Sequence, residues 1–151
     1  VDEMSVIDIN VADLLPHDGK MVLLDKVLQY DQESLVAEVI VRDDGLFASH
    51  NKIPAWIGIE YMAQTVAAHG GMMCYLAGKP INLGFLLGSR RYVSSVADFD
   101  VGSHLMVKVS RIIEDQGLGV FDCHISAEGI DISAKLNVYQ PDKAENKIIS
   151  K

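Results

Sequence analysis

A long apolar run that contains a single charged residue, Glu60, dominates this sequence. From Ile53 to Gly78 the chain reads IPAWIGIEYMAQTVAAHGGMMCYLAG, and most of its side chains are of kinds that pack in protein cores. Burying a lone carboxylate as an ion is costly, so such a group is paired, protonated or used in chemistry. Glu60 is therefore the first candidate for a functional residue, with a structural acid or a solvated face residue as the alternative.

The run is predicted to form a buried helix from about Pro54 to Ala77. Proline suits the first turn of a helix, and Gly78 is a typical stop signal. The length would allow a membrane span, but Glu60 and His69 would then lie in lipid, which is unfavourable. A helix this apolar in a soluble protein needs to be enclosed by other elements.

Composition predicts one cytoplasmic domain, residues 1–151, with a real core. Hydrophobic residues make up 49% of the chain and the net charge is -8 without a basic tract, which argues against nucleic-acid binding. Cys74 and Cys123 lack metal-ligand spacing and are expected to be buried free thiols in a reducing setting. The acidic N-terminal stretch does not resemble a signal peptide, and the polar tail, residues 143–151, is expected to fray.

Six strand-like stretches flank the predicted helix, and a short helical turn is expected at 11–15. The strands are predicted at 21–30, 34–41, 84–93, 104–113, 119–127 and 130–139. Apolar and polar residues alternate cleanly in the later strands, which is typical of an antiparallel sheet with one solvated face. Such a sheet, curled around the helix, would bury it on nearly every side. The predicted fold is therefore α+β and of the hotdog type, an antiparallel sheet wrapped around one long central apolar helix.

Four segments resemble the motifs of the β-hydroxyacyl-[acyl-carrier-protein] dehydratases, the hotdog family of fatty-acid elongation. Residues 14–27, LLPHDGKMVLLDKV, resemble the family's opening LLPHR-x-P-F-LLVD-x-V, and residues 47–50, FASH, resemble F-x-G-H. Residues 54–64, PAWIGIEYMAQ, resemble P-G-V-L-x-x-E-A-x-A-Q, and residues 99–102, FDVG, resemble a later turn motif less tightly. The sequence PAWIGIEYMAQ, with GFLLGSRRY downstream, resembles the dehydratase-like proteins associated with aryl polyene pigment clusters more closely than it resembles the housekeeping enzyme.

The resemblance implies removal of water from a 3-hydroxyacyl thioester on the phosphopantetheine of acyl-carrier protein, which gives a trans-2-enoyl thioester. In the family, a histidine and a carboxylate from the two subunits of a dimer do this work. By motif position, His50 would be the base or proton shuttle, and Glu60 would hold and protonate the 3-hydroxyl. Backbone N–H groups of Ala55, Trp56 and Ile57, at the start of the helix, would bind the thioester carbonyl. One base and one acid suffice for this reaction, and no cofactor is predicted. No group of His, Cys, Asp and Glu residues has metal-ligand spacing, so no metal is predicted either.

The sequence departs from the family pattern at two points near the expected site. His50 lies only four residues before Pro54, whereas the family's histidine stands several residues farther from the proline. The family's glycine after the proline is Ala55 here, which adds a methyl group where the thioester would lie. His17, in the opening motif, is the reserve catalytic residue.

Charge and fold also suggest partners for the chain. Acyl-carrier protein is acidic, so this acidic chain needs a local basic patch to bind it, and the candidates are Arg90 and Arg91 with Lys79 or Lys108. Hotdog subunits usually close an exposed sheet edge by pairing, so we expect a homodimer or a pair with another hotdog subunit.

Two other functions remain open on the same scaffold. In an acyl thioesterase, Glu60 would activate water to attack the thioester carbonyl. In a non-catalytic acyl-thioester-binding or partner subunit, His50 would point away from the carboxylate of the neighbouring chain.

Overall fold

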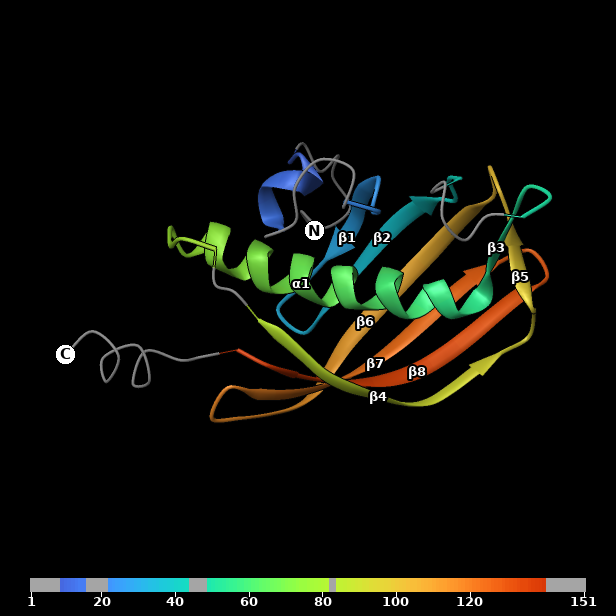
Figure 1. Cartoon of the computed structure of the whole chain (residues 1–151). Coiled ribbons are helices and arrows are strands. Elements are labelled where there is room, and N and C mark those ends of the chain that lie inside the picture. The colour runs from blue at the N-terminus through green and yellow to red at the C-terminus, as the bar shows by residue number, and fades with distance from the viewer. Residues whose placement is uncertain (1–8, 16–21, 44–48, 82–83, 141–151) are drawn as a thin grey trace.

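The computed structural model describes residues 9–15, 22–43, 49–81 and 84–140, and shows one helix cradled by a curled antiparallel sheet (Figure 1). The sheet has six strands in the order β1-β2-β6-β7-β8-β4. Their bounds are β1 Lys26–Tyr30, β2 Ser34–Ile40, β4 Phe85–Ser94, β6 His104–Asp115, β7 Leu118–Ala127 and β8 Ile130–Tyr139. This is the predicted hotdog arrangement. Strands β1 and β4 form the two edges of the sheet, which curls around the helix.

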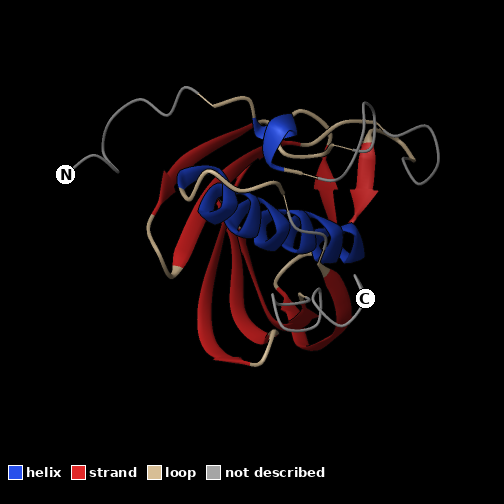
Figure 2. Cartoon of the chain, turned by 90° about the vertical axis from the view of Figure 1, so that its left-hand side faces the viewer, coloured by secondary structure: helices blue, strands red, loops and turns tan. Residues whose placement is uncertain are grey.

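Helix α1, Gly58–Leu76, lies in the concave face of the sheet (Figure 2). It begins later than predicted, because Pro54 is extended and belongs to the three-residue strand β3, Lys52–Pro54. A single 3₁₀ turn, η4, Ala55–Ile57, joins β3 to α1. Among the described residues, no helix is long and apolar enough to cross a membrane.

A second sheet of two short strands lies beside the start of α1. Strand β3 pairs with β5, Asp98–Asp100, so that Ile53 stands opposite Phe99 and both are buried. Neither strand was predicted, since three residues are too few to show the alternation that marks a strand in sequence. The pair matters because it fixes where the chain enters η4 and α1.

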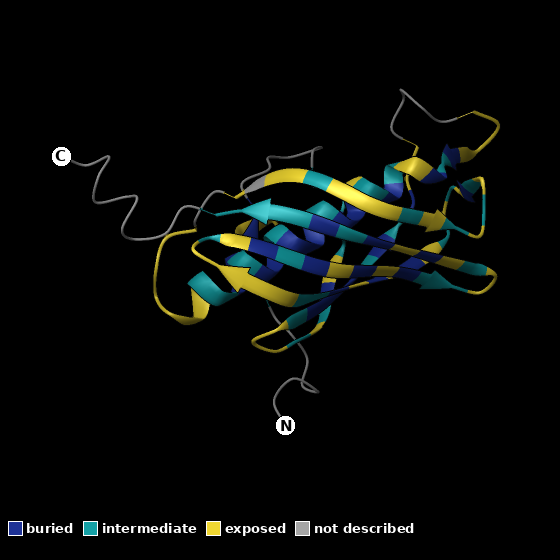
Figure 3. Ribbon diagram, turned by 90° about the horizontal axis from the view of Figure 1, so that it is seen from below, coloured by how far each residue is buried: buried dark blue, intermediate teal, exposed yellow. Residues whose placement is uncertain are grey.

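Alternation along β6, β7 and β8 separates an inner apolar face from an outer polar one, as predicted. Leu105, Val107 and Val109 of β6 point inward, and so do Phe121 and Ile125 of β7. Tight turns join these strands, and Gln116 and Gly117 between β6 and β7 both have positive φ, as two-residue hairpins require. Figure 3 shows the alternating burial of these strands, and shows edge strand β4 exposed over much of its length.

The other side of α1 is covered by the N-terminal part of the chain. The predicted helical turn is a 3₁₀ helix, η2, Val11–Leu14, and Leu14 is fully buried against the helix. Gly71 permits this approach, because a Cβ at that position would collide with the Leu14 carbonyl oxygen. The expected fraying tail lies outside the described residues.

Candidate functional site

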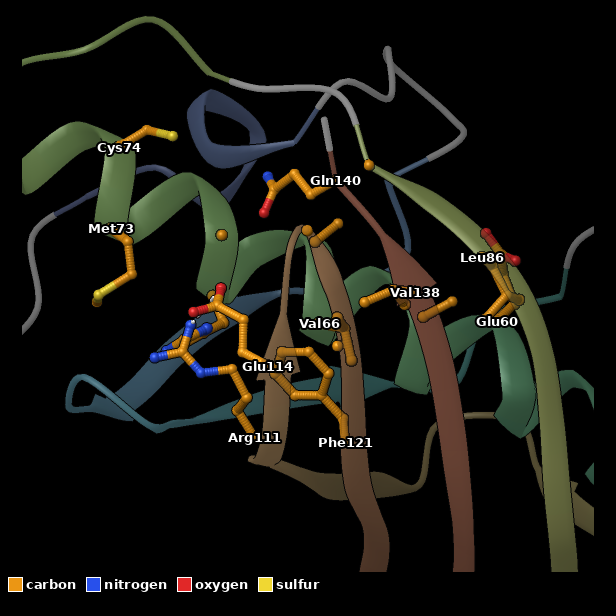
Figure 4. Close-up of a pocket in the computed structure, with 17 residues that line it drawn as sticks. Glu60, Val66, Met73, Cys74, Leu86, Arg111, Glu114, Phe121, Val138 and Gln140 are labelled. Atoms are coloured by element: carbon orange, nitrogen blue, oxygen red, sulfur yellow. Dashed lines mark hydrogen bonds and ion pairs between the residues drawn. The ribbon is translucent and has the colours of Figure 1, made fainter. Parts of the chain in front are cut away.

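A pocket of about 390 Å³ lies between α1 and the sheet and contains Glu60 in its wall (Figure 4). The helix contributes one stripe of mostly small residues, and the sheet contributes larger apolar ones. The lining includes Glu60, Ala63, Val66, Ala67, Gly70, Met73 and Cys74 of α1, and Leu86, Phe121 and Val138 of the sheet. At the usual helical rise, Glu60 and Cys74 are about 21 Å apart along the helix axis. The pocket is therefore elongated, with the acid at one side.

Glu60 lies in the first turn of α1 and is exposed. The sequence predicted a helix enclosed on nearly every side, but within one chain the sheet leaves this part of the helix surface open. The reason is geometric, since α1 packs mainly on η2, β2 and β6 and much less on β4 and β8. A carboxylate at this opening can reach a ligand in the pocket while keeping access to water.

Gln64 connects the Glu60 carboxylate to the buried interior. Its amide nitrogen donates to Glu60 Oε1 at 3.2 Å, and its amide oxygen accepts the Leu23 backbone N–H at 2.8 Å. The Gln64 side chain is only 1% exposed. Because the amide is fixed at its oxygen end by the backbone, it orients the carboxylate one helical turn earlier.

His50 lies at the tip of a tight turn and is exposed. Ser49 and Lys52 exchange both backbone hydrogen bonds, at 2.9 and 3.0 Å. His50 and Asn51 between them have φ values of 54° and 62°, the pattern of a type I′ turn. The turn presents the imidazole to solvent before β3, whereas Glu60 follows β3 and η4. His17 lies outside the described residues.

The three predicted carbonyl-binding residues form the 3₁₀ turn η4 at the start of α1. The Ala55 N–H donates to the Ala97 carbonyl at 2.9 Å, so this N–H is already engaged in the fold. Trp56 is 53% exposed, and Ile57 is half-buried. The exposed Trp56 indole therefore lies next to the N-terminal end of α1.

The Tyr92 hydroxyl of β4 donates to the Ala55 carbonyl. Burial raises the pKa of Tyr92 to about 12, so the hydroxyl keeps its proton at neutral pH and remains a donor. The same hydroxyl lies where a Cβ of Gly58 would be. Glycine at the first position of α1 thus permits this close packing of the helix start on β4.

Polar side chains line the part of the pocket near the middle of α1. His69 is 2% exposed, and its Nε2 lies 2.9 Å from the Gln32 carbonyl. Burial lowers the pKa of His69, so the neutral ring donates from Nε2. Arg111 forms ion pairs with Glu33 and Glu114, each at 3.3 Å. His69 is therefore packed in the core as a neutral ring.

His104, His124 and Cys123 do not line this pocket, whereas Cys74 does. His104 contacts Glu38 at 3.3 Å, and His124 pairs with Asp131 on the outer face of the sheet. Cys123 is buried and Cys74 is half-buried, and both are free thiols. Within the described ranges no group of three or more His, Cys, Asp or Glu side chains could hold a metal ion.

Two of the four predicted basic residues come together on the outer face of the sheet. Arg91 and Lys108 line one shallow depression there, together with Lys135, which is paired with Asp122. Lys79 follows the end of α1 and does not line this depression. Strands β4 and β6, not the helix end, therefore supply the local positive charge.

Comparison with known proteins identifies the family. The profile of the ApeP-like family, described as ApeP dehydratase, matches residues 9–149. The chain belongs to the ApeP-like dehydratase family. The ApeI:P dehydratase heterocomplex of Xenorhabdus doucetiae contains a chain that is 32% identical, with a TM-score of 0.81, over 95% of this chain and 99% of that one. The dehydratase resemblance read from the sequence motifs is thus confirmed.

More distant structures share the fold alone with this ApeP-like chain. An uncharacterized protein of Pyrococcus horikoshii is 12% identical with a TM-score of 0.60, over 81% of this chain and 86% of that one. A hypothetical thioesterase of Streptococcus pneumoniae with coenzyme A is 14% identical with a TM-score of 0.59, over 76% and 86%. No curated protein sequence matches significantly.

Sequence reasoning missed the two residues that hold the start of α1 in place. Gly58 carried a usable signal, since a glycine inside a helical pattern often marks close packing. Tyr92 carried no such signal, because the sequence RRYVS is typical of the end of an ordinary strand. The direction of the Tyr92 side chain depends on how β4 pairs with β8.

Proposed function

We propose that this ApeP-like chain dehydrates 3-hydroxyacyl thioesters carried on acyl-carrier protein to trans-2-enoyl thioesters, in aryl polyene or other specialised fatty-acid synthesis. Family membership supports the reaction class. The observation that carries the proposal is Glu60, oriented by Gln64 at one side of an elongated pocket with apolar side chains in both of its walls. An acyl chain fits such a pocket, and its reacting carbons would lie beside the carboxylate.

The proposed chemistry assigns one proton transfer to each side chain. The base, His50, takes a proton from C2 next to the thioester carbonyl, and the electron pair forms the C2–C3 double bond. The C3–O bond breaks as Glu60 gives its proton to the departing hydroxyl, which leaves as water. Enolate charge on the thioester oxygen would be stabilised by backbone N–H groups of η4, with Trp56 and Ile57 as the candidates.

We further propose that the working site forms between two hotdog subunits. His50 is displayed on an exposed turn, and Glu60 lies at the open side of the pocket, so each is accessible to a neighbouring chain. Edge strand β4 pairs only with β8 in the described sheet and exposes Leu86, Leu87 and Val93, which suits pairing with a second subunit. The relative from Xenorhabdus doucetiae is part of a heterocomplex, and this favours a second, different hotdog subunit over a homodimer.

The carrier protein is proposed to dock near Arg91 and Lys108. Both line one depression on the outer face of the sheet, and a phosphopantetheine arm would reach the pocket from there around edge strand β4. Exchanging either residue for glutamate should raise KM for the carrier-bound substrate and leave kcat little changed.

The deciding experiment is mass spectrometry of a 3-hydroxyacyl-carrier protein incubated with the chain, alone and with its co-expressed hotdog partner. We expect loss of one water from the acyl group, slowed about 100-fold or more when Glu60→Gln and His50→Asn are combined in one chain. In a homodimer each single substitution should have the same effect, whereas in a complex with a different subunit each should disable only one of the two sites. Asparagine is chosen because it tolerates the positive φ of this turn. His104→Asn, on β6 away from the pocket, is the matched control and should retain full activity.

Other outcomes of that experiment assign the alternatives. Release of free acid would indicate a thioesterase. Loss of activity in Glu60→Gln but not in His50→Asn would move the base elsewhere, with His17 tested next. Dehydration that needs the second subunit and is insensitive to both substitutions would make this chain a non-catalytic acyl-binding subunit. The exposed and shortened His50 turn is the observation that favours this alternative.

A further inference from the structure

A β-bulge in edge strand β4 decides which of two neighbouring side chains faces the helix. Arg90 pairs with Lys135 and Val93 pairs with Ser133. Two residues of β4, Arg91 and Tyr92, therefore stand opposite one residue of β8, Ala134. Arg91 has a φ of 57°, a left-handed conformation that a bulge can impose on a non-glycine residue.

The bulge reverses the direction of both side chains. Arg90 lies opposite Lys135 on the outer face, so regular alternation would turn Arg91 inward and Tyr92 outward. In the structure Arg91 lines the outer depression with Lys108, whereas the Tyr92 hydroxyl reaches Ala55 inside. One extra residue thus brings a tyrosine, and not an arginine, to the start of α1.

Tyr92 helps to fix the orientation of the peptide unit between Ala55 and Trp56, together with the Gly58 N–H, which also donates to the Ala55 carbonyl. A trans peptide is planar, with its C=O and N–H pointing in opposite directions, so a hydrogen bond to the Ala55 carbonyl also sets the direction of the Trp56 N–H. The Ala55 N–H is held in turn by the Ala97 carbonyl at 2.9 Å. The turn η4 is therefore held from both sides before α1 begins, and Glu60 projects from the following turn.

We propose that Tyr92 is a positioning residue for the dehydration, which acts through the Ala55 carbonyl to orient the η4 backbone toward the thioester and the first turn of α1 toward the 3-hydroxyl. The proposal rests on the proposed function, because it assigns η4 and Glu60 to the reacting end of the substrate. Tyr92 itself touches neither substrate nor reacting atoms.

The test compares Tyr92→Phe with wild type, each prepared as the active assembly. The substitution keeps the packed ring and removes only the hydroxyl. We expect kcat to fall about ten- to a hundredfold, since small misplacement of reacting groups has effects of this size. KM should change less than kcat, because the pocket walls are untouched. Tyr75→Phe, on the exposed end of α1, is the matched control and should behave as wild type.

Trp56 provides a readout that does not require turnover. It is the single tryptophan of the chain and lies in η4, so acrylamide quenching of its fluorescence reports the order of this turn. Tyr92→Phe should increase quenching in the unliganded protein at an unchanged melting temperature. Tyr75→Phe should leave it unchanged.

The outcomes separate this inference from the proposed function. Equal kcat and equal quenching in wild type and Tyr92→Phe would overturn the positioning role and leave the dehydratase intact. A large fall in melting temperature with kcat per folded molecule unchanged would show a purely structural tyrosine and would also overturn it. If wild type does not dehydrate any substrate but Tyr92→Phe loosens Trp56, the proposed reaction fails while the Tyr92 contact still orders η4.

Discussion

The two sides of helix α1 differ in how closely neighbouring elements pack against them. On the side of η2 and β2, small residues allow close contact, and Leu14 packs directly on the backbone at Gly71. On the side of β4 and β8, equally small residues face the pocket. The atoms nearest to a Cβ added at Gly70 belong to the Gln140 side chain, the closest at 3.2 Å. Small residues on a helix therefore serve two opposite purposes here, to admit a neighbour on one side and to leave space on the other.

The adjacent glycines offer the sharpest test of this difference. Gly71→Ala forces a methyl group into the Leu14 carbonyl and should lower the free energy of unfolding by about 2 kcal/mol or more. Gly70→Ala meets a movable amide and gains helix propensity, so its unfolding free energy should change by less than about 1 kcal/mol. Urea denaturation of both variants measures the effect, and equal losses would contradict the comparison.

The neighbouring alanines repeat the test with larger side chains. Ala68 is fully buried, so Ala68→Leu should lower the free energy of unfolding by about 1–3 kcal/mol through overpacking. Ala67→Leu points into the pocket and should cost little stability while raising KM for long acyl chains more than for short ones. Two results would contradict this difference between the two sides of the helix. One is an Ala68→Leu variant as stable as wild type, and the other is an Ala67→Leu variant with wild-type KM for all chain lengths.

Gln64 lies at the border between the two sides. In Gln64→Leu the Leu23 N–H loses its acceptor, and we expect a loss of about 1–2 kcal/mol in the free energy of unfolding. The Glu60 carboxylate loses its amide contact as well, so kcat should fall beyond any loss of folded protein. A kcat per folded molecule that is unchanged in Gln64→Leu would contradict the orienting role of this amide.

The smallest expected effect concerns pH. Burial lowers the pKa of His69 in the folded state, so the unfolded chain takes up a proton more readily as pH falls below about 6.5. This residue therefore contributes a loss of stability on acidification through that range, and none above it. His69→Gln should show a shallower fall in urea midpoint between about pH 7 and pH 5 than wild type, and parallel curves would exclude His69 as the cause.

Much of the fold could be predicted because its signals are periodic. The strands around 104–139 alternate, and the apolar run around Glu60 predicts a helix, so both were found within a few residues. The short strands β3 and β5 have no period to detect. Tyr92 was missed because its inward direction follows from the register of β4 on β8, a pairing of residues far apart in the chain.

The candidate site was only partly predictable for a related reason. Motif spacing identified Glu60, and the structure shows the Gln64 contact that orients it. Its exposure agrees with the alternative of a solvated face residue. The sequence could not decide this, because apolar composition shows that a helix is buried but does not show which of its sides a single chain leaves open. That is decided by the distance of β4 and β8 from the helix, which no local pattern encodes.

The pocket beside α1 also makes ligand binding measurable as heat resistance. The pocket of about 390 Å³ exists only in the folded state, so a ligand that binds there stabilises the folded state against the unfolded one. A ligand at 100 times its Kd adds about 2.7 kcal/mol to the free energy of unfolding. For a domain of this size that is roughly 5–11 °C in Tm. A panel of acyl chains could thus be ranked by melting temperature before any of them is turned over.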